Sequence, residues 1–532
     1  MVFNSVEFLL FFPIAVIGYF ILTMRLKSAF LSRLFLLALS LFFYGSWKPE
    51  YLALIILSVL VTWASGLLME GQSRNRKRIV LAGSLVLNLG ILFFFKYYGF
   101  FAETLRLLAP NAPAMPSFNV LLPVGISFYT FQALGYSIDV WYGRVRAERN
   151  LCTYALFVTF FPQLVAGPIE RTGSLLPQFK TNHGFDYDRV TSGLKLAAWG
   201  MFKKVVIADR LALYVNGVYG EPAAYPAAAL ALATFFFAFQ IYCDFSGYSD
   251  IAIGCARVLG FNLMTNFRQP YFAASIADFW RRWHISLSAW FKDYLYIPLG
   301  GSRRGAFRQK VSLLVTFLVS GLWHGAAWHF LAWGALHGIL QIIERGHGPF
   351  LGLGLCPKVP SPRSPAGKEG RFKPIKITAH PFAKPLARKC AAFARICVTF
   401  TLVCCAWIFF RADSVGDAVV IFAKLSGLPA NLIHLYRQLP ALGIVGVVRA
   451  AFQLGNDAAN PIDGFGVTAF GISALCILVL LVHDILSHNA PEERFVSARR
   501  PLLFRWAGYY ALILAILLSW NIEASQFIYF TF

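Results

Sequence analysis

Long apolar runs recur along nearly the whole chain. The first runs from Phe8 to Met24, and later ones include 79–95, 393–410, 465–482 and 502–520. Each is close to the length of about 20 residues that a helix needs to cross a hydrocarbon core of about 30 Å. The pattern predicts an all-α, polytopic membrane helical bundle with about 11 to 13 membrane segments, re-entrant helices included.

Lys and Arg gather in short clusters between the apolar runs. Cytoplasmic loops carry an excess of these residues, so the clusters give an orientation. No signal-peptide cleavage site precedes the first run, which is therefore expected to remain as the first span. Both termini are then expected on the outer side of the membrane. The clusters that set this are Arg25, Lys27 and Arg33, then Arg74, Arg76, Lys77 and Arg78, then Arg144, Arg146 and Arg149.

One short apolar stretch, 151–166, breaks this alternation. Basic residues stand on both sides of it, Arg149 before and Arg171 after. A segment that enters and leaves on the cytoplasmic side would restore the alternation. Because such segments are tolerated only where protein or water surrounds them, we predict a re-entrant segment enclosed by the bundle.

Residues 266–310 mix basic and aromatic side chains in a way that is unusual for a span. This mixture predicts helices at the cytoplasmic interface, with tryptophans and tyrosines at headgroup depth. A Pro-rich, basic stretch follows over 349–391, which a helical bundle cannot absorb. We therefore expect a membrane-embedded core over 1–348, a cytoplasmic linker over 349–391, and C-terminal membrane helices of the same domain over 392–532.

Composition supports the membrane assignment. Of the 532 residues, 58% are hydrophobic and 14% are charged, whereas soluble domains carry about 25% charged residues. The formal charge of +23 lies in the loop clusters that the positive-inside rule explains, so no nucleic acid partner is expected. The nine cysteines are scattered without a C-x-x-C pair, which argues against a zinc site and against a disulfide framework.

Histidine in apolar surroundings is the most informative chemistry. The sequence has no H-E-x-x-H, no P-loop and no G-x-S-x-G elbow, so a nucleophilic serine is not favoured. His324 follows an apolar run in G-L-W-H-G, and His284 stands in F-W-R-R-W-H-I-S. A neutral imidazole can accept a proton from a hydroxyl or thiol near pH 7. The alternative for each is a buried histidine bonded to a backbone carbonyl, and spacing alone does not separate the two.

Two further histidines follow on the next apolar stretch. His329 and His337 lie five and thirteen residues beyond His324, spacings that do not keep the three on one helix face. No shared metal site is expected, and His329 and His337 are interpreted as packing residues.

Two carboxylates, Asp244 and Asp250, stand among aromatic residues. They are candidates to pair with Arg281 or Arg282, or to hold a histidine ring in one tautomer. The alternative is that they cap helix N-termini. Capping is favoured for Asp250, while Asp244 stays open between the two.

The sequence contains several long motifs. They are F-W-R-R-W-H-I-S-L-S at 279–288, D-Y-L-Y-I-P-L-G-G at 293–301 and G-L-W-H-G at 321–325. Further motif segments lie at 2–5, 122–128, 163–169, 242–250 and 528–530. Together they closely resemble the membrane-bound O-acyltransferases, and within them the alginate O-acetyltransferase branch. The likeness covers nearly the whole chain, although the 349–391 linker is longer than that branch leads one to expect.

The resemblance implies a helical bundle around a central tunnel. It places the invariant histidine of the family, the catalytic base, at His324 and a second catalytic residue at His284. We further predict that substrate contacts come from Arg281, Arg282, Trp283, Trp323 and Asp244.

It also implies a reaction. Acetyl from a cytoplasmic donor, acetyl-CoA, would pass across the inner membrane to a periplasmic acetyltransferase partner that modifies an exopolysaccharide, with alginate the first candidate. No bound cofactor is expected. The alternatives are O-acetylation of cellulose or peptidoglycan, D-alanyl transfer to teichoic acid, and a non-catalytic membrane conduit.

Overall fold

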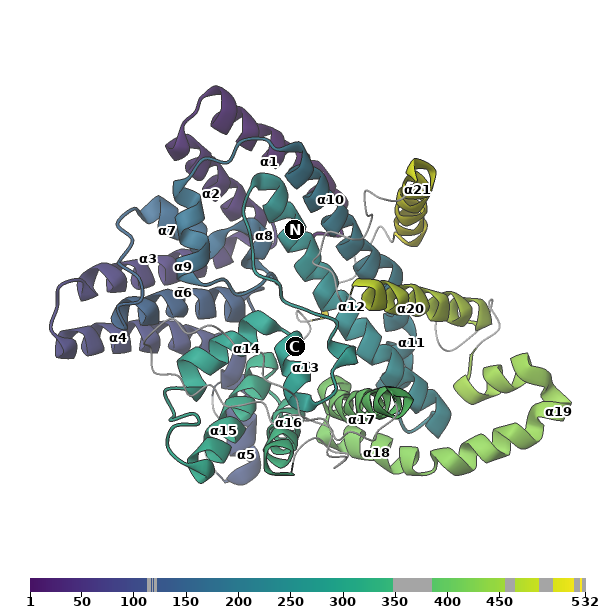
Figure 1. Ribbon diagram of the computed structural model, residues 1–532. Helices are drawn as coiled ribbons and strands as arrows, with labels where there is room; N and C mark the ends of the chain where they lie inside the picture. The colour runs from purple at the N-terminus through teal and green to yellow at the C-terminus, as the bar shows by residue number, and fades with distance from the viewer. Residues whose placement is uncertain are drawn as a thin grey trace.

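The protein is built from helices around one long central helix (Figure 1). The computed structural model describes residues 1–111, 116, 118, 122–347, 385–454, 465–487, 501–520 and 527–528. The predicted linker therefore lies outside the described residues as far as residue 384, and a helix begins at Pro385. No β-strand occurs within these ranges. The prediction of an all-α protein is confirmed.

Eleven α-helices precede the central helix in the described part of the chain. They are α1 (Val6–Phe20), α2 (Ala29–Gly45), α3 (Leu52–Met69), α4 (Arg74–Leu92), α5 (Tyr98–Leu108), α6 (Ile126–Trp141), α7 (Leu151–Thr159), α8 (Phe161–Leu164), α9 (Thr172–Leu175), α10 (Tyr187–Met201) and α11 (Asp209–Gly220).

The central helix and the helices after it complete the described fold. They are α12 (Ala227–Leu259), α13 (Ile276–Arg282), α14 (Ile285–Phe291), α15 (Ala306–His324), α16 (Trp328–His347), α17 (Pro385–Arg411), α18 (Val415–Ser426), α19 (Leu428–Phe452), α20 (Val467–Ser487) and α21 (Leu502–Ser519). Four π-helical turns extend or join these helices, at Ile21–Arg25, Phe93–Tyr97, Phe202–Ala208 and Lys292–Tyr296.

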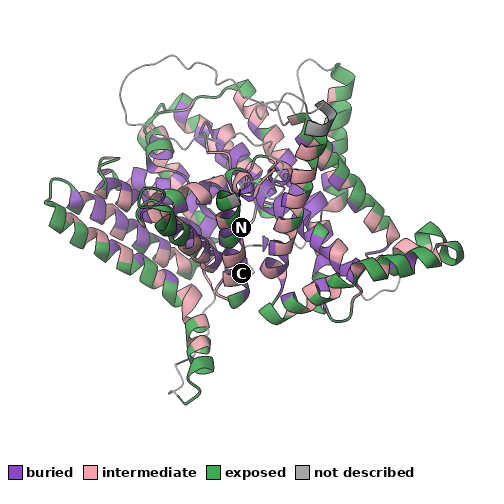
Figure 2. Cartoon of the chain, turned by 60° about the horizontal axis from the view of Figure 1, so that its bottom comes forward, coloured by how far each residue is buried: buried purple, intermediate pink, exposed green. Residues whose placement is uncertain are grey.

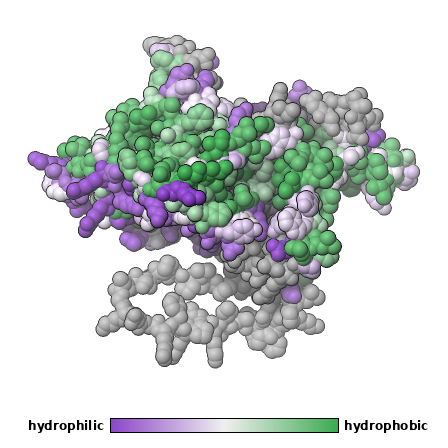
Figure 3. All heavy atoms as spheres, turned by 90° about the horizontal axis from the view of Figure 1, so that it is seen from above, coloured by the Kyte–Doolittle hydropathy of each residue, from purple (hydrophilic) through white to green (hydrophobic). Residues whose placement is uncertain are grey.

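Seven of the described helical segments are long and apolar enough to cross a membrane, or eight if the bent pair α18 and α19 counts as one span. They include Val6–Arg25, Arg74–Leu108, Ala227–Leu259 and Val467–Ser487. The chain is thus a multi-pass membrane protein. Its surface agrees, because a broad apolar band crosses the face in Figure 3 and hydrophilic residues gather along one edge.

The core lies along α12. Most of this helix is buried, whereas α20 and α21 on the outside are largely exposed (Figure 2). Glycines bring α10 against it: a Cβ added to Gly193 would lie 2.7 Å from the carbonyl oxygen of Gly254, and one added to Gly247 would lie 2.7 Å from that of Gly200. Small residues at such crossings let backbones approach within van der Waals contact in membrane bundles.

The segment predicted to be re-entrant is broken, as such a segment must be. It consists of the short helices α7 and α8, interrupted at Phe160. Nearly all its side chains are buried, and Phe160 and Phe161 are fully so. Gln132 and Gln163 both donate hydrogen bonds to the carbonyl of Phe157, at 2.6 and 2.8 Å. Protein therefore supplies the hydrogen bonds that lipid could not supply at this break.

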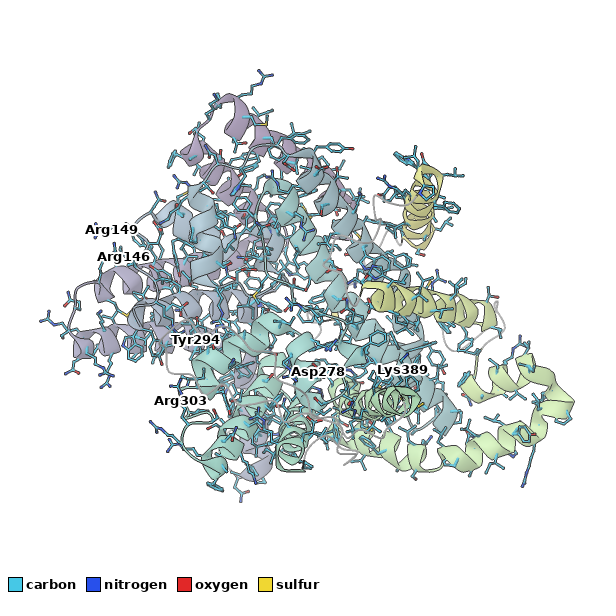
Figure 4. The ribbon with its side chains drawn as sticks, in the orientation of Figure 1. Arg146, Arg149, Asp278, Tyr294, Arg303 and Lys389 are labelled. Carbon is cyan, nitrogen blue, oxygen red and sulfur yellow. The ribbon has the colours of Figure 1, made fainter. Side chains whose placement is uncertain are left out.

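In the segment 266–310, α13 packs against α16, and the indoles of Trp280 and Trp283 are buried in protein. The depth of these aromatic residues in the membrane stays a prediction. Basic and polar groups line the surface of the neighbouring loops. Arg146, Arg149, Tyr294 and Arg303 are labelled on one flank of the molecule in Figure 4.

Candidate active site

His324 is the last residue of α15 and is 2% exposed. Its ring centroid lies 5.0 Å from those of Trp323 and Trp333 and 5.3 Å from that of Phe410. α16 lies close alongside, because Gly321 of α15 meets the carbonyl of Phe330 and Gly334 of α16 meets that of Phe317, with no room for a Cβ on either glycine. The first glycine of the G-L-W-H-G motif thus serves the close packing of the helix that carries His324.

The backbone that carries His324 is fixed from another helix. The ammonium of Lys96 donates to the carbonyl oxygens of Trp323 at 2.7 Å and of His324 at 3.1 Å. The hydroxyl of Tyr97 donates to the carbonyl of Leu322 at 3.0 Å. Both donors stand on the π-helical turn after α4. The last carbonyls of a helix lack partners within it, so these two side chains complete the end of α15.

His284 lies between α13 and α14 and is fully buried. Its backbone is left-handed, with φ of 43°, a conformation that is uncommon for any residue except glycine. The ring centroid lies 5.9 Å from that of Trp323 and 4.6 Å from that of Phe245. The structure therefore brings both predicted catalytic histidines to one tryptophan, Trp323.

A cavity of about 40 Å³ opens at His324. It is also lined by Trp323, by Lys96 and by residues 122–128, a segment that the motif analysis had singled out. A second cavity of about 770 Å³ shares Lys96 and Leu122 with the first. Its polar lining residues are Lys204, Asp209, Asn216, Gln240, Asp244, His329, Arg411 and Asp413. A large polar space thus adjoins the small one that His324 lines.

Asp244 lies within α12 and lines the large cavity, but it pairs with neither of the predicted arginines and with no histidine. Its carboxylate pairs with Lys204 at 2.7 Å and accepts a hydrogen bond from the backbone N–H of Ile528 at 2.8 Å. Asp250 pairs with Lys203 at 2.6 Å. Neither caps a helix and neither pairs with Arg281 or Arg282, because the lysines of the turn at 202–208 occupy this face of α12.

The remaining predicted contact residues lie apart from both cavities. Arg282 bonds Asp278 at 3.0 Å, and the side chain of Arg281 is 64% exposed with its Nε 3.8 Å from the same carboxylate. Trp283 is fully buried, with its ring centroid 5.1 Å from that of Trp407. Of the five predicted substrate contacts, only Trp323 and Asp244 line a cavity described here.

His329 and His337 are each bonded within the protein. His329 Nδ1 lies 3.0 Å from the carbonyl of Phe409, and His337 Nδ1 accepts from the indole N–H of Trp280 at 3.2 Å. His329 also lines the large cavity. Both contacts fit the interpretation as packing residues.

Sequence reasoning missed two lysines, Lys96 and Lys204, which the structure places at the cavities. Each follows or interrupts an apolar stretch. That position is the only signal available, and it is shared by lysines that simply extend to the membrane surface. The carbonyls that Lys96 meets lie 227 and 228 positions away. Lys204 pairs with the nearby Asp209 and also with Asp244, which lies on another helix.

Residues 142–352 match the model of the membrane-bound O-acyltransferase family, a range that contains both His284 and His324. The chain is 31% identical to the peptidoglycan O-acetyltransferase of Helicobacter pylori, over 100% of this chain and 98% of that protein. It is 36% identical to a probable alginate O-acetylase of Pseudomonas putida, over 92% and 98%. A teichoic acid D-alanyltransferase of Bacillus subtilis is 26% identical over 52% of this chain and 70% of its own length.

The helical membrane architecture and these relatives define the class. This chain belongs to the membrane-bound O-acyltransferase family and is an O-acyltransferase.

Proposed function

We propose that the protein transfers acetyl from acetyl-CoA, across the bacterial inner membrane, for O-acetylation of an exopolysaccharide, with alginate the first candidate. In this proposal both termini are periplasmic, and a periplasmic acetyltransferase receives the acetyl group and passes it to the polymer. The observation that carries the proposal is the placement of His324, buried at a small cavity that adjoins a large polar one, in a chain of an O-acyltransferase family.

His324 acts as the general base in this reaction. Its imidazole accepts the proton of an acceptor hydroxyl as the oxygen attacks the acetyl carbonyl carbon. The carbon–sulfur bond of the thioester breaks, and the proton passes to the departing sulfur to give the free thiol. The products are an acetyl ester and CoA, so no oxidant or metal is consumed. Burial among aromatic rings keeps bulk water, the competing acceptor, away from the acetyl group.

The acetyl donor meets basic side chains on its way in. Arg303 and Arg304 are exposed ahead of α15, and Arg308 is exposed in its first turn. The Arg171 guanidinium lies 4.8 Å from the ring centroid of Tyr294 and bonds Asp293 at 2.7 Å. Clustered positive charge raises the local concentration of a polyanion such as CoA. The mixed charges of the large cavity, by contrast, suit a hydroxyl-bearing acceptor.

The test is complementation of a strain that lacks the gene. Polymer acetyl content is measured with wild type, with His324→Ala and with His337→Ala, at equal membrane levels of each protein. His337 serves as the matched control because it is a buried histidine on the adjacent helix that lines neither cavity. We expect acetyl to be restored by wild type and by His337→Ala and to be lost with His324→Ala. Full acetylation with His324→Ala contradicts the proposed mechanism and favours the alternative of a non-catalytic membrane conduit.

Peptidoglycan is the second candidate acceptor. The full-length similarity to the H. pylori enzyme favours it over teichoic acid, because the teichoic acid D-alanyltransferase of B. subtilis matches a smaller part of the chain. The same complementation separates the candidates when acetyl is assayed in purified exopolysaccharide and in purified peptidoglycan. The polymer that loses acetyl in the null strain identifies the acceptor.

A further inference from the structure

The loop before α13 holds His284 from two sides. The backbone N–H of Ile285 donates to the carbonyl of Asn266 at 3.0 Å, and that of Arg268 donates to the carbonyl of Arg282 at 2.9 Å. These bonds secure the left-handed residue between them. A non-glycine residue in that conformation costs on the order of 1–3 kcal/mol, and such strain persists only where the surroundings fix it.

The side chain of Asn266 faces the ring of His284. Asn266 is fully buried, and its Oδ1 lies 3.2 Å from Nδ1 of His284. The same oxygen accepts the backbone N–H of Ser286 at 3.2 Å and the hydroxyl of Ser286 at 2.9 Å. The amide nitrogen on the other side donates to the hydroxyl of Ser249 at 3.3 Å.

These contacts fix which atom of the amide faces the histidine. A backbone N–H can only donate, so the Asn266 atom that meets the N–H of Ser286 is the carbonyl oxygen. A carbonyl oxygen can only accept, so the His284 nitrogen beside it carries the proton. In a neutral imidazole only one nitrogen is protonated. The proton is therefore on Nδ1, and Nε2 bears the free lone pair.

Nε2 is buried and has no hydrogen-bond partner among the described residues. A buried acceptor without a partner costs about 1–3 kcal/mol. With the proton on Nδ1, the basic nitrogen Nε2 lies in a buried site, on the ring that packs on Trp323 beside His324.

We infer that Asn266 is a positioning residue for the transfer reaction: its amide oxygen holds His284 in the Nδ1–H tautomer, so that Nε2 is available to accept a proton. The inference rests on the proposed function and on the role of second catalytic residue that the family resemblance implies for His284. The assignment of the tautomer stands on the geometry alone and can be tested separately.

The first test reads the tautomer directly. Full-length protein with ¹⁵N-labelled histidine is reconstituted in lipid and examined by magic-angle-spinning NMR, and the His284 signals are assigned by their absence in His284→Asn. We expect a protonated Nδ1 and an unprotonated Nε2 in wild type. A proton on Nε2 overturns the inference whatever the reaction proves to be.

The second test reads the reaction in membrane vesicles that contain Asn266→Ala, Asn266→Asp or the control Asn262→Ala, which lies in the same loop but is exposed. Asn266→Ala is expected to lower kcat at least tenfold without changing KM, because a histidine in the wrong tautomer cannot accept the proton at Nε2. Asn266→Asp keeps the acceptor but adds a negative charge that favours the imidazolium. It is expected to retain activity and to move the acid limb of the pH–rate profile to higher pH.

A purely structural role would give a different result. Asn266→Asp would then fold and show the wild-type pH profile, and that outcome overturns the inference even if Asn266→Ala fails to accumulate. Unchanged kcat in an accumulated Asn266→Ala overturns it as well. Failure of the proposed function has its own signature, because His324→Ala would then keep full activity while the tautomer of His284 remained as assigned.

Discussion

The ammonium of Lys96 donates a hydrogen bond of 3.1 Å to the backbone carbonyl of His324. The two residues are 228 positions apart in the sequence, and the lysine stands on a turn within the segment Arg74–Leu108, one of the candidate spans. Positive charge at the C-terminus of a helix is favourable because the carbonyls there carry partial negative charge. The contact therefore places a cation and a rigid support directly behind the candidate base.

Replacing Lys96 with Met should lower acetyl transfer by at least tenfold. The change removes two charge-assisted hydrogen bonds from the end of α15, each worth about 1.5–3 kcal/mol, and a small displacement of a base is costly in rate. Acetyl content per unit of membrane protein measures it. Tyr97→Phe is the matched control, because it removes one neutral hydrogen bond from the same helix end and should cost less. Equal activity of Lys96→Met and wild type would show that the support is dispensable.

The buried ion pair between Lys204 and Asp244 should matter for stability more than any surface pair. The two side chains are 2% and 4% exposed, and Lys204 also reaches Asp209 at 2.9 Å. Removing one partner of such a pair leaves an uncompensated charge and costs about 3–5 kcal/mol. Lys204→Met is therefore expected to lower the Tm in detergent clearly. The double variant with Lys204→Met and Asp244→Asn is expected to lose less Tm than the sum of the losses in the two single variants.

The control for that experiment is Arg149→Ala. Arg149 bonds Glu70 at 3.3 Å with side chains that are 81% and 42% exposed, a setting in which ion pairs contribute about 0–1 kcal/mol. Its Tm should stay close to that of wild type. A Lys204→Met protein as stable as Arg149→Ala would contradict the prediction.

Gly321→Ala should weaken the packing of α15 on α16. Its Cβ would meet the carbonyl of Phe330, a backbone atom that cannot rotate away, so the two helices must separate. Overpacking of this kind costs about 1–3 kcal/mol. We expect a lower Tm together with lower acetyl transfer, because His324 ends the same helix. Gly83→Ala on α4 is the matched control, since nothing lies within 4 Å of its added Cβ.

Glu170 should make stability depend on pH. Burial raises the pKa of this carboxyl from 4.5 to about 7, although the N–H of Met264 donates to it at 2.6 Å. The folded protein then binds more protons than the unfolded chain between those values, so stability falls as pH rises from about 4.5 to 7. Glu170→Gln should remove this fall and be up to about 3 kcal/mol more stable than wild type above pH 7. Tm measured from pH 5 to 8 checks it, and parallel curves for the two proteins would refute it.

The main features of the architecture follow from local patterns. Runs of about 20 apolar residues predict spans because a bilayer offers backbone groups no other partner, and the helices Val6–Arg25 and Val467–Ser487 lie where the runs predicted them. The break at Phe160 likewise lies in the stretch that the charge alternation had singled out.

Contacts between helices that are distant in the sequence could not be predicted from the sequence alone. The two aspartates of α12 were predicted to pair with arginine or histidine, or to cap a helix. They pair with Lys203 and Lys204 instead, because the glycines of α10 and α12 bring the turn after α10 against that face of α12. Similarly, Trp283 was expected at a substrate and is buried in an aromatic cluster. Which faces meet depends on the packing of all the helices at once.

The sequence alone thus determined that the chain is a helical membrane protein and that His284 and His324 are its candidate catalytic residues, since apolar length and the motifs are local properties of the chain. Only the tertiary structure decided that both histidines pack on Trp323, that Lys96 holds the end of α15, and that the amide of Asn266 orients the ring of His284. Hydrogen bonds act over about 3 Å, and residues distant in sequence come within that range only when the helices have packed.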